Sequence, residues 1–247
     1  MSKPLNHKCY GSIAHLPGSR VGQTDHYVTE GQARIATVKT RDSHDVVIIQ
    51  EKLDGACVGV AKINNELVAL TRSGNLCVRS QFIHHHTFVD WMYRHYNRFN
   101  ALLDEGERVV GEWLALAHGT LYNQQQRGWE PFVAFDLMKG TTRLPCYLFN
   151  SRVGKFFNTP PIIANDPHTI EWVLEECPKS RYGGEHVEGF VWRVERSPYA
   201  KSGPYVDFLC KWVKPTYIAG KYLPEFSNAQ PVWNYYEAPV RAEALNH

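Results

Sequence analysis

Two apolar runs separated by a lysine, an aspartate and a glycine constrain the fold of this chain most strongly. Residues 46–49 are β-branched, as in a strand covered on both faces, and an apolar pattern resumes at residues 58–63. Between them lies Lys52-x-Asp54-Gly55. Because glycine adopts positive φ at no steric cost, the segment predicts a tight reversal with Lys52 at a strand end and Asp54 beside it. We expect this reversal to form the floor of a pocket.

A lysine in this position has two interpretations. It can act as a nucleophile only if its amine is partly deprotonated, which burial and nearby positive charge or metal promote. Alternatively, Lys52 is a solvated side chain at the turn of a hairpin, which is the commoner case for an isolated K-x-D-G. The rest of the chain decides between the two.

Composition indicates a folded protein but names no partner. The 247 residues are 43% apolar and 13% aromatic, enough for one large domain or two small ones. A net charge of +2 does not by itself indicate nucleic-acid binding. The six cysteines form no C-x-x-C pair, and the sequence shows neither an apolar leader nor an apolar run of membrane-spanning length. We therefore expect reduced thiols in a cytoplasmic protein without a membrane anchor.

Hydrophobic periodicity predicts strands interspersed with a few helices. The predicted strands cover residues 46–52, 57–63, 67–72, 108–114, 131–138, 187–193 and 206–215. The predicted helices cover residues 81–103, 143–157 and 167–177, the last opened by Asp166-Pro167. Residues 46–80 are predicted to form a meander of neighbouring strands, and residues 9–45 to form loops with short strands. This pattern indicates an α+β fold.

Charged residues stand on or at the ends of the apolar strands. They are Lys52, Arg72, Glu112, Glu188 and Lys211. Because a bare carboxylate is costly to bury, these groups predict strands that converge on a polar pocket for a phosphorylated ligand and a divalent metal. For Glu112 and Glu188 the alternative is a structural ion pair with a buried arginine.

Three consecutive histidines, His84, His85 and His86, fall in a predicted helix. Adjacent helical side chains point in different directions, so the three cannot converge on one ion as ligands at i and i+4 would. We expect surface or partly hydrogen-bonded histidines, and we expect that changing all three leaves the covalent reaction of Lys52 nearly intact.

The motifs K-x-D-G, R-S-G, G-E, F-D, E-G-F and K-x-V-K occur in that order over residues 46–215. The ordered set resembles the covalent nucleotidyltransferases, which comprise ATP-dependent RNA ligases, DNA ligases and messenger RNA capping guanylyltransferases. Within this superfamily it is most similar to the RNA ligases, because residues 111–113, 132–136 and 188–191 resemble the RNA ligase motifs. The HLPGSR segment at residues 15–20 resembles a leader sequence of some members.

The resemblance also implies how the chain is divided. Residues 1–222 are expected to form an α+β nucleotidyltransferase (ATP-grasp-like) domain, with antiparallel sheets flanked by helices. Residues 223–247 are too few for the OB-fold domain of DNA ligases and capping enzymes. We therefore expect no OB-fold domain and a short tail that packs on the domain, with an RNA-contacting tail as the alternative.

Carried over to this sequence, the resemblance implies four catalytic residues. Lys52 attacks the α-phosphate of ATP, expels pyrophosphate and forms a lysyl-AMP phosphoamide. Asp54 shapes the turn beside it, Glu188 acts on a bound Mg²⁺ or Mn²⁺, and Lys211 contacts the α-phosphate. The metal and the cationic side chains offset charge that develops on the phosphoryl oxygens.

The resemblance further implies a nucleotide-binding set. Glu51 is expected at the adenine edge, Arg72 and Glu112 at the ribose hydroxyls, and Phe132 on the adenine face. For Phe132 the alternative is packing in the core.

Two positions depart from the family pattern. Cys57 stands where RNA ligases commonly carry an asparagine. Leu209 stands where the last motif usually carries the first of two lysines, so the companion of Lys211 is missing or is replaced by Lys214.

The substrates implied by the resemblance are ATP and RNA ends. AMP passes to an RNA 5′-phosphate, and a 3′-hydroxyl then displaces AMP and seals the strand. We expect the protein to act as a monomer. The alternatives are a DNA ligase that joins nicks by the same chemistry and a non-catalytic module that binds nucleotide or RNA.

Overall fold

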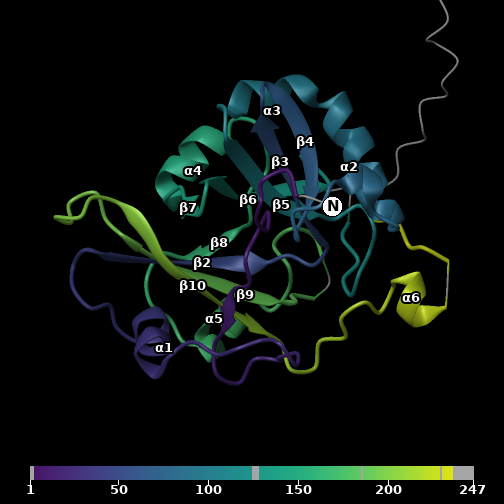
Figure 1. Cartoon of the computed structure of the whole chain (residues 1–247). Helices are drawn as coiled ribbons and strands as arrows, with labels where there is room; N and C mark the ends of the chain where they lie inside the picture. The colour runs from purple at the N-terminus through teal and green to yellow at the C-terminus, as the bar shows by residue number, and fades with distance from the viewer. Residues whose placement is uncertain (1–2, 124–127, 185, 229, 236–247) are drawn as a thin grey trace, which may run out of the picture.

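The computed structural model describes residues 3–123, 128–184, 186–228 and 230–235. Two five-stranded sheets lie one above the other, and each carries helices on its outer side (Figure 1). The described strand pairs are antiparallel, except that the short β1 pairs with β10 in parallel. The predicted α+β class with antiparallel sheets and flanking helices is therefore confirmed.

The first sheet has the strand order β1-β10-β9-β2-β8. Its strands are β1 (Ala14–His15), β10 (Tyr205–Val213), β9 (Gly189–Arg196), β2 (Asp45–Lys52) and β8 (Ile162–Ala164). Helices α1 (Glu30–Thr37) and α5 (Ile170–Glu176) cover its outer side through an apolar core that includes Val47, Ile49 and Trp192. Strand β2, which ends at Lys52, is thus hydrogen-bonded to β9 on one side and to β8 on the other.

The second sheet has the order β4-β3-β5-β6-β7. Its strands are β3 (Ala56–Ile63), β4 (Glu66–Thr71), β5 (Glu107–Trp113), β6 (Phe132–Lys139) and β7 (Thr142–Arg143). Three helices cover its outer side, namely α2 (Ile83–Arg94), α3 (Tyr96–Leu102) and α4 (Cys146–Val153). The core between them is rich in aromatic side chains. The short η1 (Cys77–Arg79) precedes α2, and α6 (Pro224–Ser227) lies near the end of the described chain.

The K-x-D-G segment does not form a hairpin, because β2 and β3 belong to different sheets. The predicted meander over residues 46–80 is therefore wrong at its first step, although β3 and β4 do pair as neighbours. Gly55 does not have the predicted positive φ. A Cβ there would lie 2.4 Å from the carbonyl oxygen of Trp113. Glycine is required at this point because the chain passes close to β5 as it crosses from one sheet to the other.

The helices differ from the sequence prediction in three places. The predicted helix over residues 81–103 is divided into α2 and α3 at His95. Helix α1 lies in the segment predicted as loops and short strands, and it begins at a capping box formed by Thr29 and Gln32. Helix α5 begins after Thr169, whose side chain caps Trp172, and not at Asp166-Pro167.

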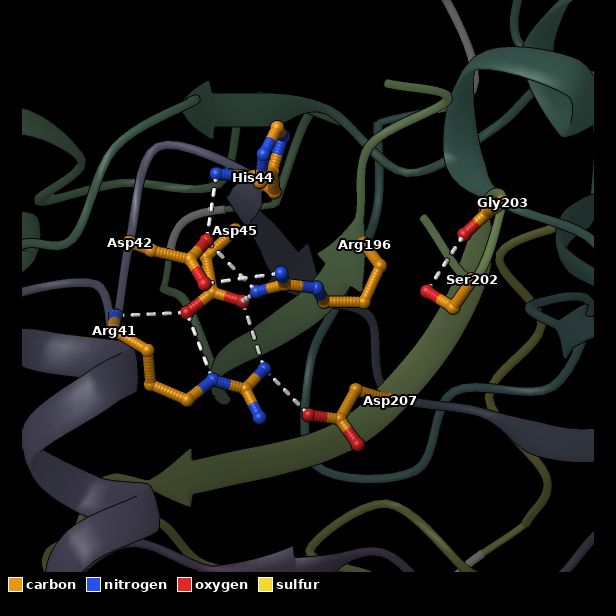
Figure 2. A network of polar contacts seen from close by, with 8 residues as sticks. All are labelled: Arg41, Asp42, His44, Asp45, Arg196, Ser202, Gly203 and Asp207. Atoms are coloured by element: carbon orange, nitrogen blue, oxygen red, sulfur yellow. Dashed lines mark hydrogen bonds and ion pairs between the residues drawn. The ribbon is translucent and has the colours of Figure 1, made fainter. Parts of the chain in front are cut away.

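A network of arginines and aspartates fixes the start of β2 (Figure 2). The buried Asp45 accepts hydrogen bonds from Arg41 and Arg196, and Arg41 also pairs with Asp207 at 2.6 Å. Burial opposes the charge of Asp45, but the two guanidinium groups lower its pKa to about 2. Because Arg196 ends β9 and Asp207 lies on β10, the network ties three strands of the first sheet together.

Residues 230–235 run back along the domain. The amide of Ala117 donates to the carbonyl oxygen of Val232 at 2.8 Å, and Asn234 bonds both to Tyr122 and to Leu114. The remainder of the predicted tail, residues 236–247, lies outside the described residues, so the division at residue 222 stays a prediction. The six cysteines are unpaired, as expected. None of the described helices combines the length and apolar character needed to cross a membrane.

Candidate active site

A cavity of about 700 Å³ is lined by residues of both sheets. Most of the candidate residues from the sequence line it, namely Glu51, Lys52, Asp54, Arg72, Glu112, Glu188 and Lys211. They come from β2, its crossing to β3, the end of β4, β5, the start of β9 and β10. The strands therefore converge on one polar pocket, and the K-x-D-G crossing forms part of its wall.

Lys52 and Glu188 form an ion pair in this cavity. Strand β2 pairs with β9 so that Lys52 lies opposite Gly189, which places the preceding Glu188 within reach. The Lys52 Nζ to Glu188 Oε2 distance is 2.6 Å. A Cβ on Gly189 would lie 1.9 Å from the carbonyl oxygen of Trp212. The glycine of E-G-F therefore allows β9 and β10 to approach each other beside the pair.

Three carboxylates act on Lys52, namely those of Glu188, Glu112 and Asp54. Burial raises the pKa of Glu188 and of Glu112 to about 7, and the carboxylates add to this by repelling one another, while Lys52 opposes the shift. Burial alone would lower the pKa of Lys52, but Glu188 and Glu112 outweigh burial and raise it above its ordinary value. These neighbours favour the protonated amine, and the partly deprotonated amine that nucleophilic attack requires stays a prediction.

Asp54 holds the loop that follows β5. Its Oδ2 accepts hydrogen bonds from the amides of Gly119 at 2.6 Å and Thr120 at 2.9 Å. The amide of Asp54 donates to the hydroxyl oxygen of Tyr122 at 2.8 Å. Asp54 therefore shapes the wall of the pocket, and Tyr122 is a partner that the sequence analysis did not identify.

Glu112 and Cys57 face each other on β5 and β3. A Glu112 oxygen accepts a hydrogen bond from the amide of Gly55 at 3.1 Å, which ties the crossing segment to β5. Among the described residues neither Glu112 nor Glu188 pairs with an arginine. Cys57 lines the cavity and is half-buried. The alternative of a structural ion pair with a buried arginine is therefore not what these two glutamates form.

Lys211 and Arg72 supply further positive charge. Burial lowers the pKa of Lys211, and the positive charge of Lys52 lowers it further. Arg72 is exposed at the end of β4 and donates to the Ser12 hydroxyl at 3.3 Å. Both groups lie where a phosphorylated ligand in the cavity would meet them.

Lys214 does not line the cavity. Side chains alternate along a strand, so Leu209 and Lys211 share the face of β10 that meets the cavity, whereas Lys214, at an odd spacing, does not share it. The amide of Lys214 donates to the carbonyl oxygen of Glu188 at 2.9 Å. The position of Lys214 therefore favours the alternative that the companion of Lys211 is missing.

Phe132 also lies away from the cavity. It is 0% exposed and packs with Phe88, Trp91 and Phe157 under the second sheet. Phe135 lines the cavity instead, with its ring centroid 5.0 Å from that of Tyr10. The pairing of β5 with β6 shifts register so that Phe135 is the extra residue of a bulge. The structure therefore corrects the assignment of adenine stacking to Phe132, because core packing is its role.

Glu51 lines the cavity but has partners elsewhere. Its side chain accepts hydrogen bonds from the Ser180 hydroxyl and from the Arg181 amide, and the residue is 2% exposed. Burial raises its pKa. In this structure Glu51 anchors the loop before β9, and its predicted contact with the adenine edge stays a prediction.

Two of the three consecutive histidines line the cavity, together with His118. His84 is only 8% exposed, so the expectation of a surface position is wrong for it. His85 Nδ1 lies 2.6 Å from the Ser80 hydroxyl, and His86 Nε2 lies 2.7 Å from the Ser80 carbonyl oxygen. In the described part of the chain no three His, Cys, Asp or Glu side chains are grouped so that they alone could hold a metal ion.

Comparison with known proteins identifies one family. A family model described as RNA ligase matches residues 45–213, which includes every motif from K-x-D-G to the lysine on β10. Comparison with curated proteins gives no match.

Several solved structures are similar to the chain. A putative ATP-dependent DNA ligase from Aquifex aeolicus is 14% identical over 83% of this chain and 49% of its own, with a TM-score of 0.47. A mutant RNA ligase of Naegleria gruberi with AMP and Mn is 15% identical over 84% of this chain and 60% of its own, with a TM-score of 0.49. An archaeal ATP-dependent RNA ligase is 18% identical over 69% of this chain and 44% of its own, with a TM-score of 0.39. The chain thus spans about half of the length of the structures that it matches.

Proposed function

The chain belongs to the RNA ligase family, and from that premise we propose that it is an ATP-dependent RNA ligase with a covalent lysyl-AMP at Lys52. The observation that carries the proposal is the amine of Lys52 in a cavity shared with Glu188, Glu112, Arg72 and Lys211. A cavity of about 700 Å³ falls within the range of volumes of small-molecule sites.

The first step needs a neutral amine. Lys52 must release one proton before it attacks, and Glu188 Oε2 at 2.6 Å can accept it, since the pKa of Glu188 is raised to about 7. The bond from Lys52 Nζ to the α-phosphorus of ATP forms, the bond from that phosphorus to the bridging oxygen breaks, and pyrophosphate leaves. Lys211 and Arg72 lie along the cavity wall, where they offset the charge on the phosphates.

Glu188 and Glu112 are the residues that would hold Mg²⁺ or Mn²⁺. Carboxylate oxygens suit these ions, which commonly bind through one or two carboxylates together with substrate phosphates. Burial raises the pKa of both glutamates, and a bound cation would stabilise their charged forms, so the pair fits the binding of a cation. The metal would supply charge neutralisation at the phosphates.

The later steps are proposed on family membership. AMP passes from Lys52 to the 5′-phosphate of an RNA strand, and a 3′-hydroxyl displaces AMP to join the two ends. ATP and RNA with 5′-phosphate and 3′-hydroxyl ends are then the substrates. The monomeric state and the cytoplasmic location stay predictions.

Labelled nucleotide tests the first step. The protein is incubated with Mg²⁺ and with ATP or GTP labelled at the α-phosphate, denatured, and assayed for retained label. We expect label from ATP, its absence in Lys52→Ala and in Glu188→Ala, and its retention in the matched control Lys62→Ala, whose amine contacts Asn100 outside the cavity. Label from GTP alone would indicate a capping enzyme, and no label from any nucleotide would indicate a binding module.

Strand joining tests the polymer. The protein is given ATP with nicked or single-stranded substrates of RNA or DNA that carry a 5′-phosphate. We expect joining of RNA, whereas joining of DNA alone would contradict the choice of RNA and favour a DNA ligase.

A further inference from the structure

The chemistry at Lys52 leaves a group of four contacting aromatic rings unused, namely Phe82, His84 and His85 at the start of α2 and His118 after β5. Phe82 stacks on His84 with ring centroids 5.5 Å apart, and His84 contacts His85 at 4.4 Å and His118 at 5.6 Å. We name these four residues the ring ladder. Phe82 is 37% exposed and His84 is 8% exposed, while the three histidines line the cavity. The ring ladder therefore runs from the protein surface into the active-site cavity.

The inner end of the ring ladder lies beside the residues of the crossing segment. Asp54 accepts a hydrogen bond at 2.6 Å from the amide of Gly119, the residue next to His118. Asp54 is separated from Lys52 by one residue, and both line the cavity with the histidines. A group seated on the ring ladder is therefore close to the amine that would carry AMP.

The cavity holds a second aromatic surface that is separate from the ring ladder. Tyr10 and Phe135 contact each other at 5.0 Å, and they come from the N-terminal segment and from β6. The ring ladder comes instead from the start of α2 and from the connection between β5 and β6. Transfer of AMP to an RNA end brings two nucleotides to Lys52, namely the adenosine of the adduct and the terminal nucleotide of the strand. Two separate aromatic surfaces match two nucleosides.

The histidines of the ring ladder are neutral near pH 7. Burial, with a smaller contribution from neighbouring histidines, lowers the pKa of His84 to about 3 and that of His85 to about 4. Neutral rings stack on bases but do not attract phosphate as cations do. His118 Nε2 is buried and has no hydrogen-bond partner within the described residues. It is therefore free to bond to the edge of a ligand.

The geometry points to a second nucleoside subsite, in which the ring ladder stacks on the base of the 5′-terminal nucleotide of the RNA strand that receives AMP. This inference rests on the function proposed above. Stacking tolerates any base because every base has a π-face. The subsite therefore selects for the presence of a terminal base and not for its identity.

The test measures a single transfer of AMP to RNA from protein that already carries the AMP adduct. Wild type, His84→Ala, His85→Ala and His118→Ala are converted to the AMP adduct with ATP, freed of nucleotide and mixed with 5′-phosphorylated RNA. The RNA carries either an ordinary or an abasic 5′-terminal nucleotide, and the half-saturating RNA concentration for release of AMP onto RNA is measured. His86→Ala is the matched control, since His86 lies on the same helix and does not line the cavity. Thermal unfolding shows that each variant is folded.

We expect His84→Ala to raise the half-saturating concentration of ordinary RNA about tenfold or more. For wild type, abasic RNA should raise the half-saturating concentration by about the same factor. For the histidine variants, abasic RNA should raise it little further. His84→Phe, which keeps a flat ring, should restore most of the binding. Because His84 is nearly buried, His85→Ala and His118→Ala serve as second variants if His84→Ala is unfolded.

Three outcomes overturn the inference. In the first, the variants have the same half-saturating concentration of ordinary RNA as wild type. In the second, abasic RNA raises the half-saturating concentration of the variants as much as that of wild type, which indicates that the histidines contact phosphate. In the third, the folded variants do not form the AMP adduct, which places the ring ladder in the ATP subsite. Failure of wild type itself to form the adduct refutes the proposed function, and the two failures are thereby distinguished.

Discussion

Strand β9 begins beside one cluster of charge and carries another along its length. In the cluster around Arg193, the guanidinium pairs with Asp136 at 2.9 Å and with Glu195 at 3.1 Å. Asp136 also accepts hydrogen bonds from the Tyr10 hydroxyl at 2.6 Å and from Arg143 at 3.2 Å. Two arginines thus face two carboxylates, and this cluster is matched in charge.

The cluster around Lys52 lines the cavity instead. The lysine pairs with Glu188, while Glu112 and Asp54 add negative charge in the same cavity. Its two glutamates have pKa values raised to about 7. A buried cluster whose carboxylates are paired with arginines holds the fold together, whereas one that lines a cavity with raised carboxyl pKa values is poised to bind a cation and to move a proton. The four predictions below test this difference.

The largest expected effect comes from Lys52→Arg. The guanidinium keeps the positive charge beside Glu188, but it stays protonated and cannot bond to phosphorus. We expect complete loss of the AMP adduct, with the free energy of unfolding within about 1 kcal/mol of wild type. Intact mass after incubation with ATP and urea denaturation measure the two. An adduct that persists would show that another residue is the nucleophile.

Arg193→Met should act on stability instead. It leaves the buried carboxylates of Asp136 and Glu195 without their guanidinium, and such a loss costs about 3–5 kcal/mol. Urea denaturation measures it, with Lys201→Met at an exposed position of the β9–β10 connection as the control. A loss below about 1 kcal/mol would mean that the cluster is not structural.

The two phenylalanines of β6 should also differ, one in its effect on stability and the other in its effect on the use of ATP. Phe132→Ala removes a fully buried ring and should cost about 3–5 kcal/mol of stability. Phe135→Ala should raise the ATP concentration needed for half-maximal adduct formation roughly tenfold, because the ring lines the cavity. The opposite division of effects would restore the assignment of stacking to Phe132.

The smallest expected effect is in the pH dependence of stability. Both glutamate pKa values are raised from 4.5 to about 7, so between these values the folded chain binds protons that the unfolded chain has released. The contribution of these groups to the free energy of unfolding therefore falls as pH rises through this window. Glu112→Gln should make the fall shallower by up to about 1 kcal/mol per pH unit. Urea denaturation at pH 5, 6 and 7 measures it, with the exposed Glu66→Gln as control, and an unchanged slope would contradict the raised pKa of Glu112.

Sequence alone predicted the elements whose signal is local. The apolar runs of β2, β3, β5, β6, β9 and β10 were each placed within a few residues, because their periodicity and β-branched content are read along the chain. The charged residues on these strands were found because a charge in an apolar run is visible without a structure. Helix α1 was missed, since its capping box at Thr29 was not used as a signal.

The rest depended on contacts between distant segments. Phe132 and Phe135 are three residues apart, so alternation along β6 puts them on opposite faces, and which face meets the cavity is visible only in the folded sheet. Gly55 was explained by a turn, whereas its cause is the carbonyl oxygen of Trp113. His84 was placed at the surface because nothing in its own helix shows that the loop around His118 covers it.

Peptide mapping of the AMP adduct tests the central claim most directly. The protein is incubated with ATP and Mg²⁺, digested, and searched by mass spectrometry for a peptide that has gained one AMP. The account predicts a single modified residue, Lys52, linked through its Nζ. An adduct on Lys211, on a histidine or on no residue of well-folded protein would contradict it.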